Sequence, residues 1–540
     1  MDRPYRISRL ARTTLAITVA ALAGGGTALA QQPPLRIALT MSEMSTTTGQ
    51  PNQGFEGYTA TGYTLYDALV NWKLDDDKTA SVPVPGLATE WAVDAKDRTK
   101  WIFKLRRGVK FHDGSEFNAD SVIWNCDKLF KKDSPQFDAQ QLAQVGGRIL
   151  SLKSCRKVDD FTVEFTTHEV DATFPSQTSY MLFSSPAQWE KVGRDWRKFG
   201  AAPSGTGPFR LERLVPRERA EFVRNNDYWD KKRIPKTEKM ILLPIPEATT
   251  RASALLSGQA DIISAPPPDF IPRLKAQGHR IVTNVYPHMW PYFMSFREDS
   301  PWRDLRVRKA VNLAVDREGI VKLLGGLAVP ARGAVDPSSP WFGTPQFQIK
   351  HDPAQARKLL AEAGYGPGKP LVLKVLVSPS GSGQMLPQPM NEYIQQNLKA
   401  VGVQLELISI DWEALRTCRR AGAGAPACRG AHGVNNSSAT NDEFTAFKRI
   451  YYSASVAPKG FNFMHYKDPV ADAMMEKAFS TFDDTRRTHA FANLHAYLVD
   501  QAVDLWVVHD VAPRAVSPKV KGYVQARNWF VDFTSAYVEK

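Results

Sequence analysis

The residue groups best suited to catalysis are clusters of serine, histidine and glycine. Each of them resembles a known catalytic or phosphate-binding motif but lacks part of it. The run from Ser380 to Gly383 lacks the leading glycine of a G-x-S-x-G nucleophile elbow. A zinc-protease motif opening at His168-Glu169 has Ala172 where its second histidine must stand. The run from Gly364 to Lys369 approaches a phosphate loop, but its leading glycine is out of register. The sequence therefore argues against an enzyme and predicts neither a metal site nor a cofactor.

Two polar loops have the composition to bind a small polar solute. One follows the predicted strand Leu35 to Leu39, and the other lies between the predicted strand Leu371 to Val377 and a helix. Ligands of α/β proteins meet loops at the carboxyl ends of strands, and the N–H groups at a helix start favour anions. A plain flexible loop is the alternative for the second. The candidate ligand-binding residues of the two loops are Thr46, Thr47, Thr48, Gln50, Ser380, Ser382 and Gln384.

The elements that must position these loops alternate between helices and strands along the whole chain. Asp352 followed by Pro353 is an N-cap with proline at the first helical position, and Gly364 ends that helix. The run from Val403 to Leu407 alternates apolar and polar residues as a strand does. The fold class is therefore α/β, with lobes built from mixed sheets and flanking helices.

The N-terminal residues read as a secretory signal peptide, residues 1–30. Four arginines between positions 3 and 12 precede a mostly apolar run, and Ala28-Leu29-Ala30 forms a small-x-small cleavage site. The apolar run is shorter than the roughly 20 residues that span a bilayer. No cysteine precedes Cys126, so the acylated cysteine of a lipoprotein is absent, and no adjacent arginines mark twin-arginine export. We expect Sec export to the periplasm as a soluble protein without a membrane span, with an uncleaved anchor as the alternative.

Chain length and net charge limit the number of lobes and the kinds of partner that the protein can have. About 510 residues remain after cleavage. A single hydrophobic core usually stabilises fewer residues than this, so several lobes are expected. The formal net charge of the full chain is +13. Basic residues are interleaved with acidic ones and form no basic stripe or nucleic-acid-binding motif. We interpret the charge as a solvated surface with mild attraction for anionic partners, and expect no nucleic-acid partner.

The four cysteines fall into two local pairs. Cys418 and Cys428 flank a loop of small residues, and Cys126 and Cys155 lie within one region of the chain. In an exported protein such pairs form disulfides more often than metal sites, and the spacing matches no zinc signature. We predict two structural disulfides, with free buried thiols as the alternative.

Several motifs occur in a fixed order over nearly the whole mature chain. They are Tyr66–Val70, Pro85–Trp91, Trp101–Gly114, Phe117–Val122, Gly205–Phe209, Arg224–Trp229, Ala248–Arg251, Leu255–Ile262 and Asp304–Ala310. Read together, they resemble the family 5 extracellular solute-binding proteins of ABC importers, which include dipeptide, oligopeptide and nickel receptors. In that family such motifs build turns and lobe cores more than ligand contacts.

The resemblance implies a two-lobed periplasmic binding protein fold (type II, cluster C-like) with mixed sheets and an extra subdomain in the first lobe. By analogy, lobe I comprises residues 31–70, 200–287 and 505–540. The extra subdomain comprises residues 71–199, and lobe II residues 288–504. A ligand that contacts both lobes would stabilise a closed form that a permease recognises.

The resemblance also locates a third group of candidate ligand residues. Peptide-binding members carry an aspartate in lobe II that pairs with the peptide amino terminus, and the run from Asn435 to Phe444 stands in about that place. Asp442 is the nearest match, although the usual tryptophan and proline are missing. Asn435 and Asn436 offer neutral donors and acceptors suited to amides, sugars or opines as well as to ammonium groups.

The function implied is that of a periplasmic receptor, a monomer that captures peptide-like or other small polar solutes and delivers them to ABC permease subunits and their ATPase. A receptor for opines, glycosides or metal chelates, or a periplasmic sensor, remains an alternative. His432 and His465 could imitate the histidines of nickel-binding members, with solvent histidines as the simpler reading. Trp290 and Trp412 could floor a pocket, but core packing is favoured.

Overall fold

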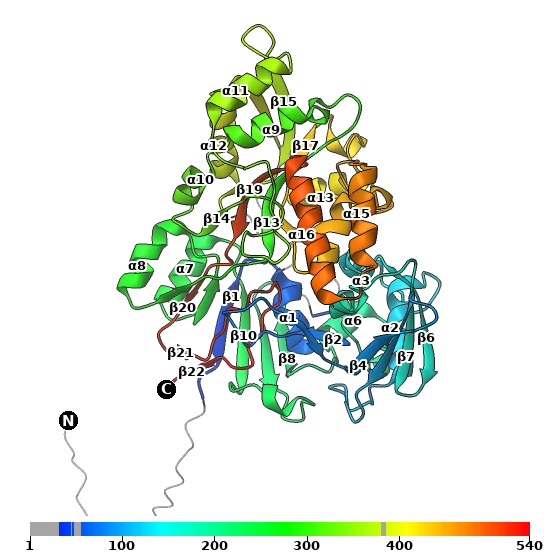
Figure 1. The fold of residues 1–540 in the computed structure, drawn as a ribbon. Coiled ribbons are helices and arrows are strands. Elements are labelled where there is room, and N and C mark those ends of the chain that lie inside the picture. The colour runs from blue at the N-terminus through cyan, green and yellow to red at the C-terminus, as the bar shows by residue number, and fades with distance from the viewer. Residues whose placement is uncertain (1–31, 45, 48–55, 380–384) are drawn as a thin grey trace, which may run out of the picture.

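The computed structural model describes residues 32–44, 46–47, 56–379 and 385–540. The predicted signal peptide and the candidate ligand residues Thr48, Gln50, Ser380, Ser382 and Gln384 lie outside the described residues. Two large sheets, each with its own helices, are joined into one molecule, and a smaller sheet packs beside them (Figure 1).

The first sheet is built around the strand that opens the described chain. Its seven strands run in the order β12-β20-β11-β1-β10-β9-β8. The central strand β1 is parallel to β10 and β11, and four of its five residues are fully buried, as expected of a strand covered on both faces. The strands are β1 (Leu35–Leu39), β8 (Phe209–Val215), β9 (Arg219–Arg224), β10 (Lys239–Pro244), β11 (Ile262–Ser264), β12 (Arg280–Val282) and β20 (Arg514–Val516).

The second sheet runs in the order β14-β19-β13-β17-β15-β16, with β18 paired to β13. The predicted strands after position 370 are confirmed as β15 and β16, which pair in parallel in continuous register. The strands are β13 (His288–Met294), β14 (Ala328–Pro330), β15 (Leu371–Val377), β16 (Val403–Ser409), β17 (Gly433–Asn435), β18 (Ser438–Ala439) and β19 (Leu505–Asp510).

The chain passes between the two large sheets twice. The first passage lies between Val282 at the end of β12 and His288 at the start of β13, and the second between Asp510 in β19 and Arg514 in β20. Below, lobe I means the part of the chain built on the first sheet, and lobe II the part built on the second.

A third, antiparallel sheet packs beside lobe I in the order β4-β5-β7-β6. Helix α2 (Ala119–Phe130) begins with a capping box in which Asn118 and Ser121 exchange hydrogen bonds, and the Cys126–Cys155 disulfide joins α2 to β6. The strands are β4 (Ala88–Val93), β5 (Lys100–Leu105), β6 (Leu152–Asp159) and β7 (Thr162–Thr167), and the small pairs are β2 (Val70–Trp72) with β3 (Pro83–Pro85) and β21 (Val520–Lys521) with β22 (Tyr537–Val538).

The helices cover both large sheets. As predicted, Asp352 caps the helix that starts at Pro353, accepting a hydrogen bond from the Gln355 N–H. The helices are α1 (Glu56–Leu65), α3 (Ala139–Val145), α4 (Phe174–Gln177), α5 (Pro186–Lys191), α6 (Trp196–Ala201), α7 (Ala248–Leu256), α8 (Ile271–Ala276), α9 (Leu305–Ala314), α10 (Arg317–Leu323), α11 (Pro353–Glu362), α12 (Pro387–Lys399), α13 (Trp412–Ala421), α14 (Arg449–Tyr451), α15 (Pro469–Phe479) and α16 (Asp484–Asp500). Of these described helices, none is both long and apolar enough to cross a membrane.

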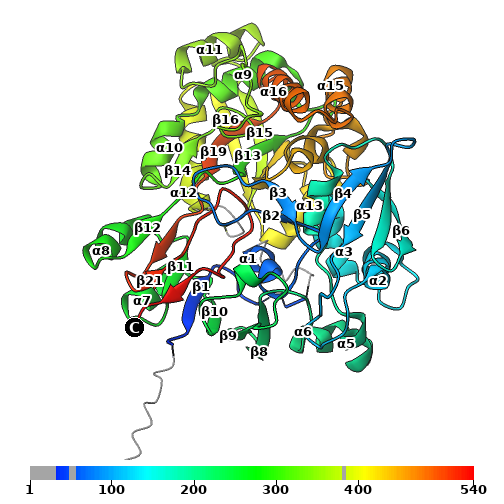
Figure 2. The ribbon, with the colours of Figure 1, turned by 60° about the horizontal axis from the view of Figure 1, so that its bottom comes forward.

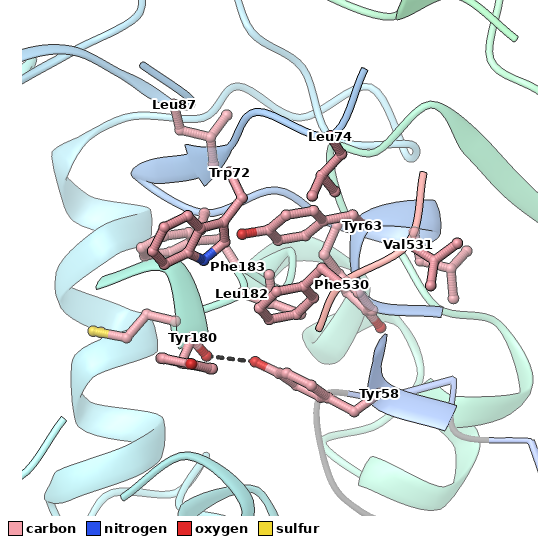
Figure 3. Packing of buried hydrophobic residues seen from close by; sticks show 14 of the residues in the cluster. Tyr58, Tyr63, Trp72, Leu74, Leu87, Tyr180, Leu182, Phe183, Phe530 and Val531 are labelled. Carbon is pink, nitrogen blue, oxygen red and sulfur yellow. Dashed lines mark hydrogen bonds between the residues drawn. The ribbon is translucent and has the colours of Figure 1, made fainter. Parts of the chain in front are cut away.

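The C-terminal segment, residues 522–540, packs between lobe I and the part of the chain that carries the small sheet. Phe530 stacks on Tyr63 of α1 with ring centroids 4.4 Å apart, and the Tyr58 hydroxyl donates to the Tyr180 carbonyl (Figure 3). These rings belong to a single buried cluster that runs from β1 through the small sheet to the C-terminal segment. Lobe I and the small sheet therefore share one core.

Both predicted disulfides are confirmed, and the four cysteines are all bonded. The Cys418–Cys428 bond joins two positions that are 10 apart in the sequence, at the end of α13. Replacing both cysteines by alanine is expected to lower the free energy of unfolding by about 2.5 kcal/mol, because the bond restricts the unfolded chain. Urea unfolding of the double variant and the wild type without reductant measures this. Equal masses of denatured, alkylated wild-type protein with and without prior reduction would contradict both bonds.

Candidate ligand-binding site

A cavity of about 100 Å³ lies between lobe II and the part of the chain that carries the small sheet. One wall comes from Ala143 of α3, from Arg148 and from Trp529 of the C-terminal segment. Lobe II supplies the opposite wall, mainly from α13 and from residues 436–439. Helices α13 and α3 lie near each other in both views of the ribbon (Figures 1 and 2). The volume has room for several water molecules, and so for a small solute.

Helix α13 presents a basic face to this cavity. Asp411 caps the helix by accepting a hydrogen bond from the Ala414 N–H. Trp412, Arg416, Arg419 and Arg420 follow at helical spacing, so they share one face, and all four line the cavity. Arg416 pairs with Glu413 one turn earlier, at 3.1 Å.

Arg419 and Arg449 are held by aromatic rings and amides. The Arg419 guanidinium lies 4.5 Å from the centroid of Phe293 and donates to the Asn436 side chain at 2.8 Å. The Arg449 guanidinium lies 4.4 Å from the ring centroid of Phe461. Burial, together with repulsion between the two groups, lowers the pKa of Arg419 to about 9, and burial lowers that of Arg449 to about 10.

Arg148 faces this pair from the opposite wall. Its guanidinium lies 5.1 Å from the ring centroid of Trp529 and donates to the Gln144 carbonyl at 2.8 Å. Burial and the nearby charge of Arg449 hold its pKa well below the usual value. The described residues that line the cavity thus include five arginines and no carboxylate.

Of the predicted asparagines, Asn436 lines this cavity and accepts the hydrogen bond from Arg419. Asn435 instead points to a second cavity of about 10 Å³ beside Trp290, where it accepts a hydrogen bond from Asn391 and donates to the Pro291 carbonyl. The side chains of Asn435 and Asn436 therefore point to different sides, as those of successive residues in an extended segment do.

Asp442 joins the two walls of the cavity and does not line it. Its carboxylate accepts a hydrogen bond from the Tyr180 hydroxyl at 2.7 Å and from the Thr445 N–H at 2.9 Å. Burial raises its pKa, although these donors act in the opposite direction. Nearby, the main-chain N–H of Trp529 donates to the side-chain oxygen of Asn441 at 3.0 Å. Both contacts join lobe II to the rest of the molecule, so the two walls are in contact in this structure.

The described part of the first polar loop packs against the small-sheet side. Thr46 is buried, its hydroxyl donates to the Gly200 carbonyl, and its own carbonyl accepts from the Tyr66 hydroxyl. Thr47 also lies beside Gly200. Neither threonine lines the arginine-rich cavity.

The two tryptophans and two histidines considered as candidate pocket residues lie at different positions in the fold. Trp412 lines the cavity and also packs in a lobe II core, and Trp290 belongs to the other lobe II core. The His432 ring accepts a hydrogen bond from the Lys374 N–H, and His465 lies against Gly422. Within the described residues, no three histidine, cysteine or acidic side chains gather as metal ligands would.

Sequence reasoning missed the arginines. Arg148 and Arg449 are 301 positions apart and meet only in the folded chain. The spacing of Arg416, Arg419 and Arg420 after a capping aspartate and Trp412 was a usable signal, because it predicts one basic helix face with an aromatic at its start. Part of the excess positive charge thus faces an internal cavity.

Two lobes joined by two passages, with a cavity whose walls come from both sides, form the two-lobed fold of periplasmic binding proteins. Comparison with solved structures supports this fold. A structure of the periplasmic binding protein DppA of Helicobacter pylori with the peptide STSA has a TM-score of 0.78, with 22% identity, covering 94% of this chain and 98% of that one. The binding protein MoaA of A. tumefaciens R10 with mannopinic acid has a TM-score of 0.74, with 21% identity, covering 95% and 100%.

The chain belongs to family 5 of the bacterial extracellular solute-binding proteins, whose model matches residues 82–469. The dipeptide-binding protein of Escherichia coli K12 is 26% identical over 496 residues, covering 86% of this chain and 88% of the relative. The resemblance and the two-lobed fold expected from the motifs are confirmed.

Proposed function

We propose that the chain is the periplasmic receptor of an ABC importer, which captures a small polar solute between its lobes and delivers it to a membrane permease. The observation that carries this is the cavity with Arg148 and Trp529 on one wall and α13 with Arg449 on the other. A solute that touches both walls binds the closed form more tightly than the open form, and this difference drives closure. The receptor needs no catalytic group and acts as an exported monomer.

Peptides lead the candidate solutes, because the relative from Escherichia coli is a dipeptide-binding protein. Opines are the second candidate class, because a protein of the same fold was solved with mannopinic acid. The division into lobe I, the small-sheet subdomain and lobe II supports the same proposal, with passages at 282–288 and 510–514 as the hinge.

Ligand-linked stabilisation tests the receptor function. The mature protein is screened by thermal shift against dipeptides, tripeptides, opines, glycosides and metal chelates, and any co-purified molecule is identified by native mass spectrometry. A true ligand at 100 times its dissociation constant adds about 2.7 kcal/mol to the free energy of unfolding. Uptake of that ligand should fail in cells that lack this chain and return when it is restored. Absence of any ligand-linked stabilisation contradicts the proposal.

A further inference from the structure

The cavity walls carry hydrogen-bond donors that the described part of the chain leaves without partners. The Nε atoms of Arg419 and Arg449, the indole Nε1 of Trp412 and the hydroxyl of Ser438 are all buried and make no hydrogen bond with the described residues. Arg449, Ser438 and Trp412 are each at least nine-tenths buried. Buried polar groups are otherwise almost always bonded, because an unmade bond costs free energy. Four such groups around one cavity indicate a missing acceptor.

Arginines buried for structural reasons elsewhere in lobe II look different. Arg308 donates through Nε to the Gln501 carbonyl and through Nη1 to two further carbonyls. Arg317 donates through Nε to the Trp506 carbonyl and through its terminal nitrogens to Asn312 and Val315. Main-chain carbonyls thus accept hydrogen bonds from the Nε atoms of Arg308 and Arg317, whereas no described residue does so for the Nε atoms of Arg419 and Arg449.

The described carboxylates nearest the cavity offset only part of its positive charge. Glu413 pairs with Arg416, and the Asp442 carboxylate, which bonds to Tyr180 and Thr445, also attracts Arg148 and Arg449. Asp504 accepts a hydrogen bond from the Tyr451 hydroxyl, and burial raises its pKa to about 8, so it is mostly protonated at neutral pH. The His288 ring on the cavity wall contacts Asp510 at 3.2 Å. The cavity therefore keeps a net positive charge.

We propose that the solute held in this cavity is a small organic anion with two or more negatively charged oxygen groups, carboxylate or phosphate. This rests on the proposed receptor function and specifies its substrate class. Guanidinium groups match both kinds of oxygen anion with paired hydrogen bonds, and the rings of Phe293 and Phe461 hold Arg419 and Arg449 in place for this. Trp412 Nε1 and the Ser438 hydroxyl add neutral donors beside them.

The same charges make closure depend on the anion. Arg148 comes from the small-sheet side and Arg449 from lobe II, so closing the lobes brings two like charges together. A dianion between them replaces this repulsion with attraction on both sides. Only a ligand that interacts differently with the open and closed forms can shift their populations, and an anion bridging these two residues does so.

Titration calorimetry and thermal shift test the proposal on the mature protein, with succinate, citrate and glucose 6-phosphate against succinamide, glucose and alanyl-alanine amide. We expect at least one polyanion to bind, with a dissociation constant that rises with salt concentration, and the neutral and cationic counterparts not to bind. The carboxylate and phosphate arms identify which oxygen anion is preferred. Failure of every polyanion at 10 mM, or equal binding of the neutral counterparts, would overturn the proposal.

Variants separate a ligand-binding role from a structural one. Arg419→Gln and Arg449→Gln are expected to weaken binding of the polyanion at least tenfold and to leave the melting temperature of the unliganded protein unchanged or higher, because they relieve repulsion. Arg449→Lys should retain part of the affinity, since it keeps the charge but not the planar fork. Arg486→Gln, an exposed arginine on α16, is the matched control and should bind normally.

Two outcomes distinguish this inference from the receptor function. Binding of neutral or cationic peptides alone, unaffected by the two glutamine variants, overturns the anion and leaves the receptor function standing. Absence of binding by any class of compound overturns both. A lower melting temperature of the unliganded variants with unchanged affinity assigns the arginines a structural role and overturns the inference.

Discussion

Replacing Asp67 by alanine is expected to lower the free energy of unfolding by about 4 kcal/mol, because it leaves several buried donors without an acceptor. The Asp67 side chain is fully buried. Its carboxylate accepts hydrogen bonds from the Tyr228 hydroxyl at 2.9 Å, the Trp229 indole at 2.8 Å and the Thr206 hydroxyl at 3.0 Å. Tyr228 and Thr206 are buried and Trp229 is partly buried, and each of these donors would lose its partner.

Substitution of asparagine at the same position separates charge from shape. Asp67→Asn keeps one acceptor oxygen but turns an amide NH2 toward two donors, so we expect about half of the loss seen with alanine. Asp227→Ala is the matched control, because Asp227 lies in the same turn as Tyr228 and is exposed. Calorimetric or urea unfolding at pH 7 measures all three. A loss below 1 kcal/mol for Asp67→Ala would contradict the central role of this carboxylate.

The Asp67 network explains why the family motifs were recognisable in the sequence. Asp67 belongs to the first motif, Thr206 to the Gly205–Phe209 motif and Tyr228 to the Arg224–Trp229 motif. A Cβ on Gly205 would lie 2.1 Å from the Leu65 carbonyl oxygen, so only glycine allows this approach. Local sequence could predict these turns because each is short, and their order along the chain identified the fold.

The ligand site could not be predicted in the same way. Its walls combine a 3₁₀ turn that ends at Arg148, one face of α13 and a single residue of the C-terminal segment, Trp529. No stretch of sequence contains more than a part of it. Asn436 was identified because it lies in a run of polar residues, whereas Arg449 follows the mostly apolar run Phe444–Phe447 and carries no local signal of its role.

Asp442 was expected from the resemblance to bind the ligand from lobe II. The structure buries this aspartate at the contact between lobe II and Tyr180. Its oxygens are nevertheless bonded to Tyr180 and Thr445, and the side chains that face the cavity are basic. What a segment contributes to a cavity depends on which of its faces the fold turns inward, and this is a tertiary property.

Lowering the pH from 7 to 4 is expected to remove about 3 kcal/mol of stability through His495 alone. This ring is fully buried, and its Nε2 accepts hydrogen bonds from the Ala334 and Val335 N–H groups. Its Nδ1 donates to the Phe342 carbonyl at 2.6 Å. Burial, with a smaller contribution from His509, lowers the pKa of His495 to about 4. A protonated ring would turn a second N–H toward two backbone donors.

The direction of the effect follows from proton binding. Between pH 6.5 and 4 the unfolded chain protonates this histidine and the folded chain does not, so stability falls as the pH falls through that window. Above pH 6.5 the contribution is fully present, and below pH 4 it is constant because both states carry the proton.

A variant isolates this contribution from the other titrating groups. His495→Gln keeps an acceptor for the two N–H groups but cannot take up a proton, so the stability difference between wild type and variant should shrink by about 3 kcal/mol from pH 7 to pH 4. His489→Gln is the control, since it makes the same substitution at an exposed position of the same helix α16. Urea unfolding at half-unit pH intervals gives both curves. Parallel curves for wild type and His495→Gln would show that the buried ring takes up its proton as readily in the folded chain as in the unfolded one, which is incompatible with two N–H groups pointing at its Nε2.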